Sequence, residues 1–319
     1  MIKYNFIKNK IKKRYKQFAE HPLISNAWLG IIKYIYLNLR LRLKKKPIIM
    51  RWTNNLKYHL SLGDGGVIGN YYFYLFEYQE SIFLIKYLKK IDTFVDVGSN
   101  HGHYTLISSG IVGAKTISIE PVKNTFRRLK MNVELNSLEN VELIQFGISN
   151  ADGYLHISND KGPKNRIIEK PIKAKSEKIK VTTLDKLLEN EGNISVIKID
   201  VEGYERQVLE GSIKLLMNHL LNVIIIELNN SNEFYNYHEK ETLSILEKYG
   251  FKPYTYSYKK ELLIPLVKKN FKTSNTIFIR NINIVNERIN NKSVFINRNQ
   301  ISIEKTVKEN SNIINNQII

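Results

Sequence analysis

Cysteine is absent from the 319-residue sequence. Its absence excludes disulfides, zinc–thiolate sites, cysteine nucleophiles and iron–sulfur clusters. Stability must therefore come from the burial of apolar side chains, and the length is sufficient for one α/β domain with an added segment. The apolar and charged fractions, 43% and 25%, are those of an ordinary globular protein, so a folded domain is expected.

Long apolar runs are also missing. The longest uncharged stretch near the N-terminus, His21–Ile32, has about half the length that a membrane span requires. The basic start of the chain reaches Glu20 before any apolar run, and no small-residue cleavage site follows, so a signal peptide is not predicted. We expect a cytoplasmic protein, and peripheral contact with the inner membrane surface stays open.

Acidic residues are almost absent from the first 51 positions. This stretch holds fourteen Lys or Arg against a single acid, Glu20, and so carries +13 of the total net charge of +19. The basic character therefore belongs to the N-terminal segment. An anionic membrane, nucleic acid or a phosphorylated substrate would each be a chemically suitable partner for it.

The N-terminal segment has the pattern of two helices, over 1–20 and 26–43. In the second, apolar residues from Trp28 to Leu43 recur at intervals of three and four. Three interpretations stay open: an arm packed on the main domain, a membrane-surface helix, and a nucleic-acid-binding arm. We expect a basic helical extension at 1–70, a main domain at 71–281 and an Asn-rich, poorly ordered tail at 282–319 with at most one helix.

Helices and strands alternate through the main domain, which is the pattern of a parallel sheet with crossover helices. The predicted fold is a doubly wound, mostly parallel seven-stranded α/β sheet. Its strands are expected at 93–97, 115–119, 141–146, 196–199, 223–228, 252–257 and 276–280. Helices are expected at 80–90, 104–111, 124–135, 204–219 and 239–249, with a short one beginning at Thr183. An antiparallel pair, 154–158 with 178–182, borders a polar loop at 159–176.

A turn with two glycines joins the first predicted strand to the following helix, in the segment Phe94–Thr105. The carboxyl end of a parallel strand is where open α/β sheets bind ligands. We expect Gly98 to let a ligand approach the backbone closely, and Gly102 to let the helix pack tightly on the strand. Asp96 would supply a carboxylate near a cationic ligand.

Glu120 follows the second predicted strand, about twenty residues after the glycine turn. A carboxylate there accepts hydrogen bonds from both ribose hydroxyls of an adenosine. A dinucleotide needs Gly-x-Gly-x-x-Gly to admit its pyrophosphate, whereas Asn100 and His103 occupy the second and third glycine positions here. The acid two residues before Gly98 suits a ligand with an ammonium group, which favours S-adenosylmethionine over NAD.

Acidic residues also end the next two parallel strands. Asp200 and Glu202 follow the strand at 196–199, and Glu227 ends the apolar run that starts at Val223. The carboxyl ends of buried parallel strands meet at one edge of the sheet, so these acids are expected at the rim of the same pocket.

The order and spacing of several short blocks resemble the FkbM-type S-adenosylmethionine-dependent methyltransferases. The blocks are Phe94–Thr105, Ile119–Pro121, Leu135–Asn136, Asn140–Glu142, Gly147–Ser149, Val181–Asp185 and Lys198–Gly203. The resemblance covers about residues 75 to 280. It implies a class I, Rossmann-like methyltransferase fold, S-adenosylmethionine as cofactor, and O-methylation of a natural product or a sugar.

The same resemblance implies a set of site residues. Asp96, Gly98 and Asn100 would line the methionine end of the cofactor, Glu120 the ribose, and Gly147 with Ile148 the adenine edge. The candidate cofactor-binding residues are Asp96, Gly98, Ser99, Asn100, Gly102, Thr105, Glu120, Pro121, Gly147, Ile148 and Asp200. Ser99, His101 and His103 depart from the residues that this family more often has at their positions.

Methyl transfer from a sulfonium is an in-line displacement that depends on holding the acceptor oxygen, methyl and sulfur in a line. A base near the acceptor hydroxyl typically adds about 10²- to 10⁴-fold. The candidate catalytic residues are Asp200, Glu202, His103 and Glu227, with Asp200 preferred, and no metal ligands are predicted. The acceptor itself, a hydroxyl-bearing small molecule or a glycan, does not follow from the sequence.

Two other functions stay open. The basic arm suggests a nucleic-acid methyltransferase, but the sequence lacks the Asn/Asp-Pro-Pro-aromatic block of amino-methylating enzymes and the cysteine that methylation of cytosine carbon 5 requires. Nucleic acid is therefore not the expected partner. The histidines at 101 and 103 suggest the second alternative, a catalytically degenerate interaction protein that keeps the cofactor fold.

Overall fold

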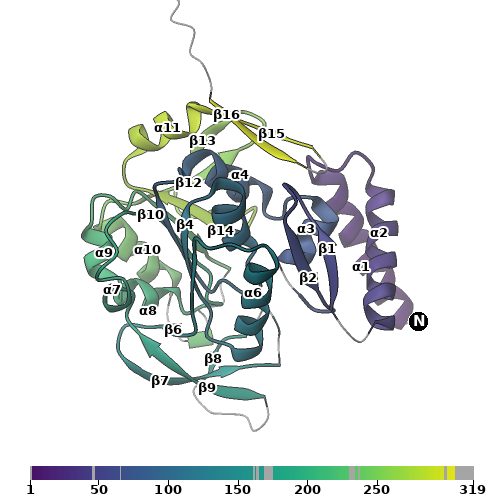
Figure 1. The fold of residues 1–319 in the computed structure, drawn as a ribbon, viewed down its shortest axis with the longest axis horizontal. Helices are drawn as coiled ribbons and strands as arrows, with labels where there is room; N and C mark the ends of the chain where they lie inside the picture. Colours follow the sequence, from purple (N-terminus) through teal and green to yellow (C-terminus); the bar gives the residue numbers. More distant parts are fainter. Residues whose placement is uncertain are drawn as a thin grey trace, which may run out of the picture.

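A computed structural model of the protein describes residues 2–44, 47–64, 66–160, 162, 165–168, 175–229, 234–235, 238–297 and 300–305. A large central sheet is flanked by helices, and two N-terminal helices stand at one side (Figure 1). Parts of two predicted segments, 161, 163–164 and 169–174 of the polar loop and 306–319 of the tail, lie outside the described residues.

The central sheet has eight strands in the described part of the chain, in the order β13-β12-β14-β11-β10-β3-β4-β5. They are β3 (Thr93–Val97), β4 (Lys115–Ile119), β5 (Val141–Ile144), β10 (Ile194–Ile199), β11 (Val223–Glu227), β12 (Lys252–Ser257), β13 (Leu262–Pro265) and β14 (Asn275–Ile279). The five strands from β5 to β11 run parallel, and β14 pairs antiparallel with β11. The predicted doubly wound α/β fold is confirmed. The difference is β13, which forms a hairpin with β12 and adds an eighth strand at the edge.

The middle of the sheet is buried on both faces. Every residue of β3 and β10 is buried, as expected for parallel strands covered by helices on two sides. Alternate residues point to opposite faces, so Val95 and Ile197 join one apolar core while Phe94 and Val196 join another. The carboxyl edge of these strands is held rigidly between the two cores.

The helices that flank the sheet differ from the prediction at two places. They are α4 (Tyr78–Tyr87), α5 (His103–Thr105), α6 (Lys123–Leu135), α7 (Leu184–Leu187), α8 (Glu205–Glu210), α9 (Ile213–Met217) and α10 (Glu239–Lys248). The predicted helix at 104–111 is short, since α5 passes directly into a π-helical segment, Leu106–Val112. The predicted helix at 204–219 is broken into α8 and α9 because Asp185 accepts hydrogen bonds from the backbone N–H groups of Lys214 and Leu215, so a new helix starts there.

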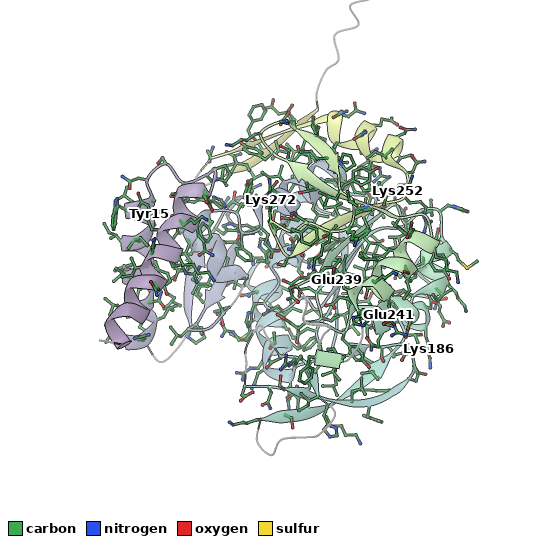
Figure 2. The ribbon with its side chains drawn as sticks, turned by 180° about the vertical axis from the view of Figure 1, so that it is seen from behind. Tyr15, Lys186, Glu239, Glu241, Lys252 and Lys272 are labelled. Carbon is green, nitrogen blue, oxygen red and sulfur yellow. The ribbon has the colours of Figure 1, made fainter. Side chains whose placement is uncertain are left out.

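The two predicted N-terminal helices are α1 (Ile2–Glu20) and α2 (Ala27–Leu43), and they pack on each other as a hairpin. Phe18 of α1 is fully buried against Gly30 of α2, where a Cβ atom would lie 2.6 Å from the Phe18 ring. Strands β1 (Ile48–Arg51) and β2 (Lys57–Leu60) and helix α3 (Val67–Phe73) connect this arm to the sheet. Seen from behind, Tyr15 of α1 and Lys186 of α7 lie at opposite flanks (Figure 2). None of the described helices has the length and apolarity needed to cross a membrane.

A second, smaller sheet follows β5. It contains β6 (Gly147–Ile148), β7 (Gly153–Ser158), β8 (Ile167–Ile168) and β9 (Ser176–Thr182), in the order β6-β9-β7-β8. The predicted antiparallel pair is confirmed as β7 with β9. This sheet lies at the lower end of the molecule in Figure 1, below the carboxyl ends of the parallel strands.

The tail from residue 282 onward, predicted to be poorly ordered with at most one helix, holds more regular structure than that in its described residues, 282–297 and 300–305. This segment forms α11 (Ile282–Asn290) and a hairpin of β15 (Lys292–Ile296) with β16 (Ile301–Lys305). Val285 and Ile289 are buried in the larger core. Asn54 fixes the hairpin, because its Nδ2 donates to the Ile301 carbonyl at 2.9 Å and its Oδ1 accepts from the Ile301 N–H at 2.7 Å. The Asn-rich composition concealed this apolar spacing.

We predict that Ile289→Ala lowers the free energy of unfolding by about 2–5 kcal/mol, because it removes a side chain that is 1% exposed from the core. Ile284→Ala, in the same helix but 39% exposed, is the matched control and is expected to cost about 1 kcal/mol or less. Urea denaturation measures both. Equal losses would mean that α11 does not dock on the core in solution.

Candidate active site

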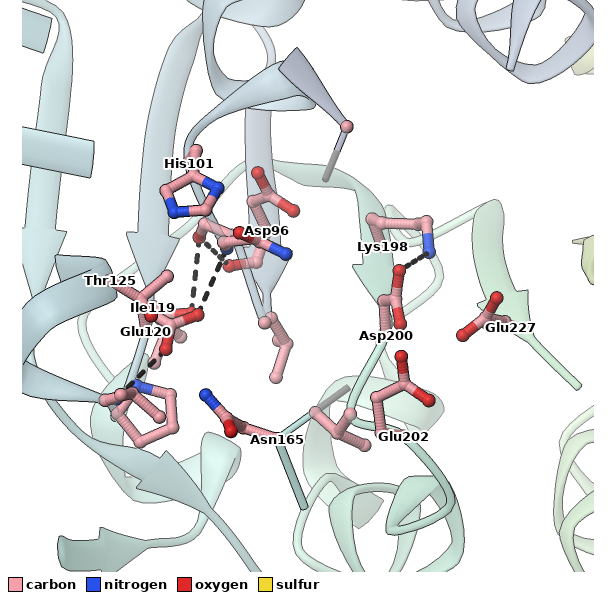
Figure 3. A pocket seen from close by; sticks show the side chains of 18 of the residues that line it. Asp96, His101, Ile119, Glu120, Thr125, Asn165, Lys198, Asp200, Glu202 and Glu227 are labelled. Atoms are coloured by element: carbon pink, nitrogen blue, oxygen red, sulfur yellow. Dashed lines mark hydrogen bonds and ion pairs between the residues drawn. The ribbon is translucent and has the colours of Figure 1, made fainter. Parts of the chain in front are cut away.

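A cavity of about 300 Å³ lies at the carboxyl ends of β3, β4, β10 and β11. Asp96 and Glu120 stand on one side of it, and Lys198, Asp200 and Glu227 on the other (Figure 3). Of the residues predicted for the site, all but Gly102 and Thr105 line this cavity. The cavity therefore lies at the edge of the sheet where the strand ends were expected to meet. Gly102 and Thr105 lie outside its lining, where Gly102 packs against Leu129 and Thr105 hydrogen-bonds to Asp96.

The two glycines of the turn are required by the protein itself. Gly98 has φ +81°, and a Cβ atom there would lie 1.9 Å from the carbonyl oxygen of Asp200. Gly102 has φ +90°, and its Cβ would lie 2.8 Å from Leu129 of α6. Gly98 was expected to admit a ligand, but the nearest group is the Asp200 carbonyl. Gly102 was expected to let the helix pack on its own strand, but the nearest group is Leu129 of α6. Both glycines let neighbouring segments close around the turn.

Asp96 is buried at the end of β3, where its Oδ2 accepts a hydrogen bond from Thr105 Oγ1 at 2.9 Å. Burial raises the pKa of Asp96 to about 7, and the Thr105 bond and the Lys198 charge oppose that rise. Ser99 Oγ donates to the Asp96 carbonyl at 2.7 Å and so fixes the turn. The Asp96 carboxylate is thus preformed beside the cavity and lacks a full countercharge.

Glu120 lies across the turn from Asp96. Its carboxylate accepts hydrogen bonds from the backbone N–H groups of Asn100, at 3.1 Å, and Val122, at 3.0 Å. Burial raises the pKa of Glu120 to about 7, against these two bonds. The side chain lines the cavity together with Pro121, Gly147 and Ile148. It is therefore held by main-chain amides in a position where a ligand can reach its remaining lone pairs.

Asn100 offers a polar group that the described protein leaves unpaired. The residue has φ +51° and lines the cavity, and its Oδ1 is buried without a hydrogen-bond partner in the part of the chain that the structure describes. A buried amide oxygen without a partner costs about 1–3 kcal/mol. A donor on a bound ligand, such as an ammonium group, would satisfy it.

The opposite wall holds a cluster of charged residues around Lys198. Lys198 is buried on β10, and its Nζ lies 3.4 Å from Asp200 Oδ2. Burial lowers the pKa of Lys198, but the surrounding carboxylates, Asp200 first, outweigh burial and raise it. Burial and the neighbouring Asp200 raise the pKa of Glu227, which favours its protonated form. The cluster thus combines an ammonium, a carboxylic acid and carboxylates within one rim.

Asp200, Glu202 and Glu227 can each direct a carboxylate oxygen within 4.8 Å of the other two. Such a spacing of oxygen ligands suits a divalent cation. The ammonium of Lys198 already supplies positive charge at 3.4 Å from Asp200. These three acids are the described residues that would hold a metal ion if the reaction used one.

The cavity thus combines three features at one edge of a parallel sheet. They are the glycine turn, the Glu120 carboxylate held by two backbone N–H groups, and the acidic rim around Asp200. Residues 96–253, which include all of these features, match the model of the methyltransferase FkbM domain. These residues form an FkbM methyltransferase domain. The match confirms the predicted family and the methyltransferase class, for which S-adenosylmethionine is the cofactor.

A curated relative shares part of this FkbM domain. The chain is 30% identical over 149 residues to the hexuronic acid methyltransferase AglP of Haloferax volcanii, which is 46% of this chain and 59% of AglP. The chain thus spans less than two thirds of that relative. Similar solved structures include a precorrin-6y C5,15-methyltransferase from Geobacter metallireducens (9% identity, 64% of this chain, 85% of that chain, TM-score 0.37) and an rRNA methylase from Streptococcus thermophilus (15%, 62%, 91%, 0.36).

The unusual histidines of this FkbM domain have structural contacts. His103 is 6% exposed, and its ring nitrogens lie 3.0 Å from Asn70 Nδ2 and 3.1 Å from Ser81 Oγ. Burial lowers the pKa of His103 to about 3. Because both nitrogens are engaged by the protein, His103 is not available to take a proton from an acceptor. His101 is also buried, 3.7 Å from Asp64.

Two charged residues that line the cavity were not among the predicted candidates. Lys198 could have been found as the single charged residue of the buried strand Ile194–Ile199. Glu77 lines the cavity next to α4, and its carboxylate accepts a hydrogen bond from Tyr104 Oη at 2.7 Å. Burial raises the pKa of Glu77, and the charge of Lys198 opposes this. No sequence signal marks Glu77, which precedes the matched domain and reaches the pocket only through the tertiary fold.

Proposed function

We propose that this protein transfers a methyl group from S-adenosylmethionine to a hydroxyl of a sugar, and that the sugar carries a carboxylate, as a hexuronic acid does. The observation that carries the methyl transfer is the division of the cavity into two sides, with Asp96 and Glu120 on one side and the candidate base Asp200 on the other. The AglP relative, whose name specifies a hexuronic acid, supports the acceptor class.

The cofactor side fits the groups of S-adenosylmethionine. Asp96 and the unpaired Oδ1 of Asn100 would bind the ammonium of the methionine part, and Glu120 would accept hydrogen bonds from the ribose hydroxyls. Gly147 and Ile148 would line the adenine edge. When bound, the cofactor supplies a methyl group on a positively charged sulfur. The protein's own contribution is to hold an acceptor oxygen in line with that methyl group.

Asp200 is the group we assign as general base. In this role the Asp200 carboxylate would take the proton of the acceptor hydroxyl as the hydroxyl oxygen accepts the methyl group that the cofactor supplies, and the cofactor sulfur would leave as a neutral thioether. Lys198 Nζ lies 3.4 Å from Asp200, and Glu227 shares a hydrogen bond with it, so Asp200 is oriented before the acceptor binds. Glu202 lines the same rim and would position the acceptor.

An aromatic surface beside the rim suits a sugar ring. Tyr204 lines the cavity, and its ring centroid lies 5.4 Å from that of Tyr235, which is 5.2 Å from that of Phe234. The guanidinium carbon of Arg166 stacks 3.7 Å from the centre of the Phe234 ring, and its Nε is buried without a partner among the described residues. Asn165 and Ile167 line the cavity, whereas Arg166 between them does not. In this proposal Arg166 would bind the carboxylate of an acidic sugar that extends from the cavity over these aromatic rings.

The affinity of the protein for S-adenosylmethionine should depend on pH. Asp96 and Glu120 bind the cofactor as carboxylates, but their pKa values in the folded protein are raised to about 7. Below pH 7 both hold protons, so affinity for S-adenosylmethionine should rise from pH 6 to pH 8, by at most about tenfold per pH unit for each group. Calorimetry in two buffers of different ionisation enthalpy should show proton release on binding. In Glu120→Gln less proton should be released, and affinity that is independent of pH would contradict the assignment.

The second prediction tests the base. Asp200→Asn should lower kcat for methylation of a glucuronic-acid-containing oligosaccharide by about 10²- to 10⁴-fold, because the amide cannot take the proton. Cofactor affinity, measured by calorimetry, should change much less. Glu202→Gln, on the same rim, is the matched control and should affect mainly KM for the acceptor. Unchanged turnover in Asp200→Asn would remove Asp200 from this role.

The third prediction tests the class of sugar. Arg166→Ala should raise KM for the glucuronic-acid acceptor by about tenfold or more, equivalent to 1.4 kcal/mol, because an ion pair with the carboxylate is lost. The corresponding glucose acceptor, which has no carboxylate, should show the same KM with both proteins. A parallel loss for both acceptors would instead indicate a general packing role for Arg166.

A further inference from the structure

Helix α2 has two apolar faces, and the protein covers one of them. Ile31, Leu37 and Leu41 are buried against α1 and α3. The second face is open to solvent and consists of large side chains that are between 46% and 84% exposed: Trp28, Leu29, Ile32, Ile35, Tyr36, Leu39 and Leu43. We call these seven residues the open face of α2.

The open face is continuous. Apart from two adjacent pairs, 28 with 29 and 35 with 36, its members follow one another at spacings of three and four, which places them on one side of α2 from Trp28 to Leu43. At 1.5 Å per residue the strip is roughly 25 Å long. Globular proteins rarely expose a connected apolar patch of this size unless it binds a partner or a membrane.

Basic side chains border the open face. By helical geometry Arg40 lies along one edge of it and Arg42 along the other, whereas Lys33, beside Arg40, donates a hydrogen bond to Tyr74 Oη at 2.8 Å. Tyr15 of α1 extends the apolar surface through ring contact with Trp28, at a centroid distance of 4.9 Å. Lys12 and Lys16, near Tyr15 on α1, are exposed as well. Long basic side chains at the border of an apolar face reach the headgroups while the apolar groups enter the lipid.

The charge decides between the candidate occupants. A second copy of this protein would bring another segment of net charge +13 against the first, which opposes self-association through this face. Nucleic acid would match the positive charge of the arm. It would, however, leave the aliphatic side chains of Ile32, Ile35 and Leu39 exposed to water. An anionic lipid surface satisfies both features, because it accepts an apolar strip at the headgroup boundary and attracts the basic flanks.

We propose that the open face of α2, with the basic residues of α1, docks this protein on an anionic lipid bilayer. This inference stands on the surface of the arm and does not depend on the proposed acceptor. It does have a consequence for the active site, because α3 contacts α2 and the residues Gly66 and Val67 at its start line the cavity. Docking would keep the cavity near the membrane, where a lipid-linked acceptor is presented.

Vesicle co-sedimentation of the full chain tests the proposal. We expect binding to phosphatidylcholine vesicles that contain about one third phosphatidylglycerol, at least roughly tenfold weaker binding to pure phosphatidylcholine, and weakening by salt. The double variant Ile32→Glu with Leu39→Glu should bind the anionic vesicles at least about 100-fold more weakly. Met217→Glu with Leu220→Glu places the same charges on exposed apolar residues of the opposite flank and should bind as the wild type does.

Thermal unfolding by circular dichroism should be unchanged in both variants, because the replaced side chains are exposed, and methyl transfer to a soluble acceptor should be unchanged too. Three outcomes would overturn the proposal. One is equal vesicle binding by the two double variants. Another is a wild-type dimer in sedimentation velocity that Ile32→Glu with Leu39→Glu converts to a monomer, without vesicle binding. The third is retention of duplex DNA with a steep salt dependence and no affinity for vesicles.

Discussion

The active end of this molecule depends on one buried ammonium group. Lys198 lies inside the central sheet on β10, where an unpaired charge would cost several kcal/mol. The protein compensates by placing carboxyl groups of β3, β11 and the loop after β10 around it. These acids would repel one another without the lysine, and the lysine would be too costly without them. The charged rim and the rigid parallel strands are therefore parts of one arrangement.

This arrangement explains how a cavity with so many acids can be stable at neutral pH. Burial raises the pKa values of Glu227, Asp96 and Glu120, which favours their neutral forms. Each carboxyl group that stays neutral removes one repulsion from the site. A cationic ligand changes the balance, because it favours the ionised form of the groups that it contacts. Binding of a positively charged cofactor and deprotonation of the pocket are thus coupled by electrostatics.

Much of the fold could be predicted because each strand of the parallel core is a short apolar run between a helix and a turn. The edge and the ends were harder. Strand β13 is partly exposed and is recognisable mainly through its pairing with β12. Val285 and Ile289 have helical spacing, but the surrounding asparagines obscured it. Some residues were predicted at the right place, but their conformation depends on tertiary contacts that the sequence does not show. Gly98 is an example, because a side chain there would collide with the Asp200 carbonyl.

The same limit applies to the site. Asp96, Glu120 and Asp200 were predictable because the ends of neighbouring parallel strands must meet. His103 was assigned to chemistry from its place beside the turn, whereas its two ring nitrogens serve to tie α3 and α4 to α5. Glu77 enters from a segment that no local pattern connects with the pocket. The position of a site residue thus follows from the strand order, whereas its role can be assigned only when its hydrogen-bond partners are known.

The pairing of Asn54 with Ile301 has a consequence for synthesis. Two hydrogen bonds join positions that are 247 residues apart, and the strand that makes them is the last described element of the chain. Contacts of such high sequence separation close late and slow the folding of a chain. While the ribosome still holds the hairpin of β15 and β16, the turn between β1 and β2 lacks its hydrogen bonds to Ile301. The contact between Asn54 and Ile301 can therefore form only after the C-terminal hairpin has left the ribosome.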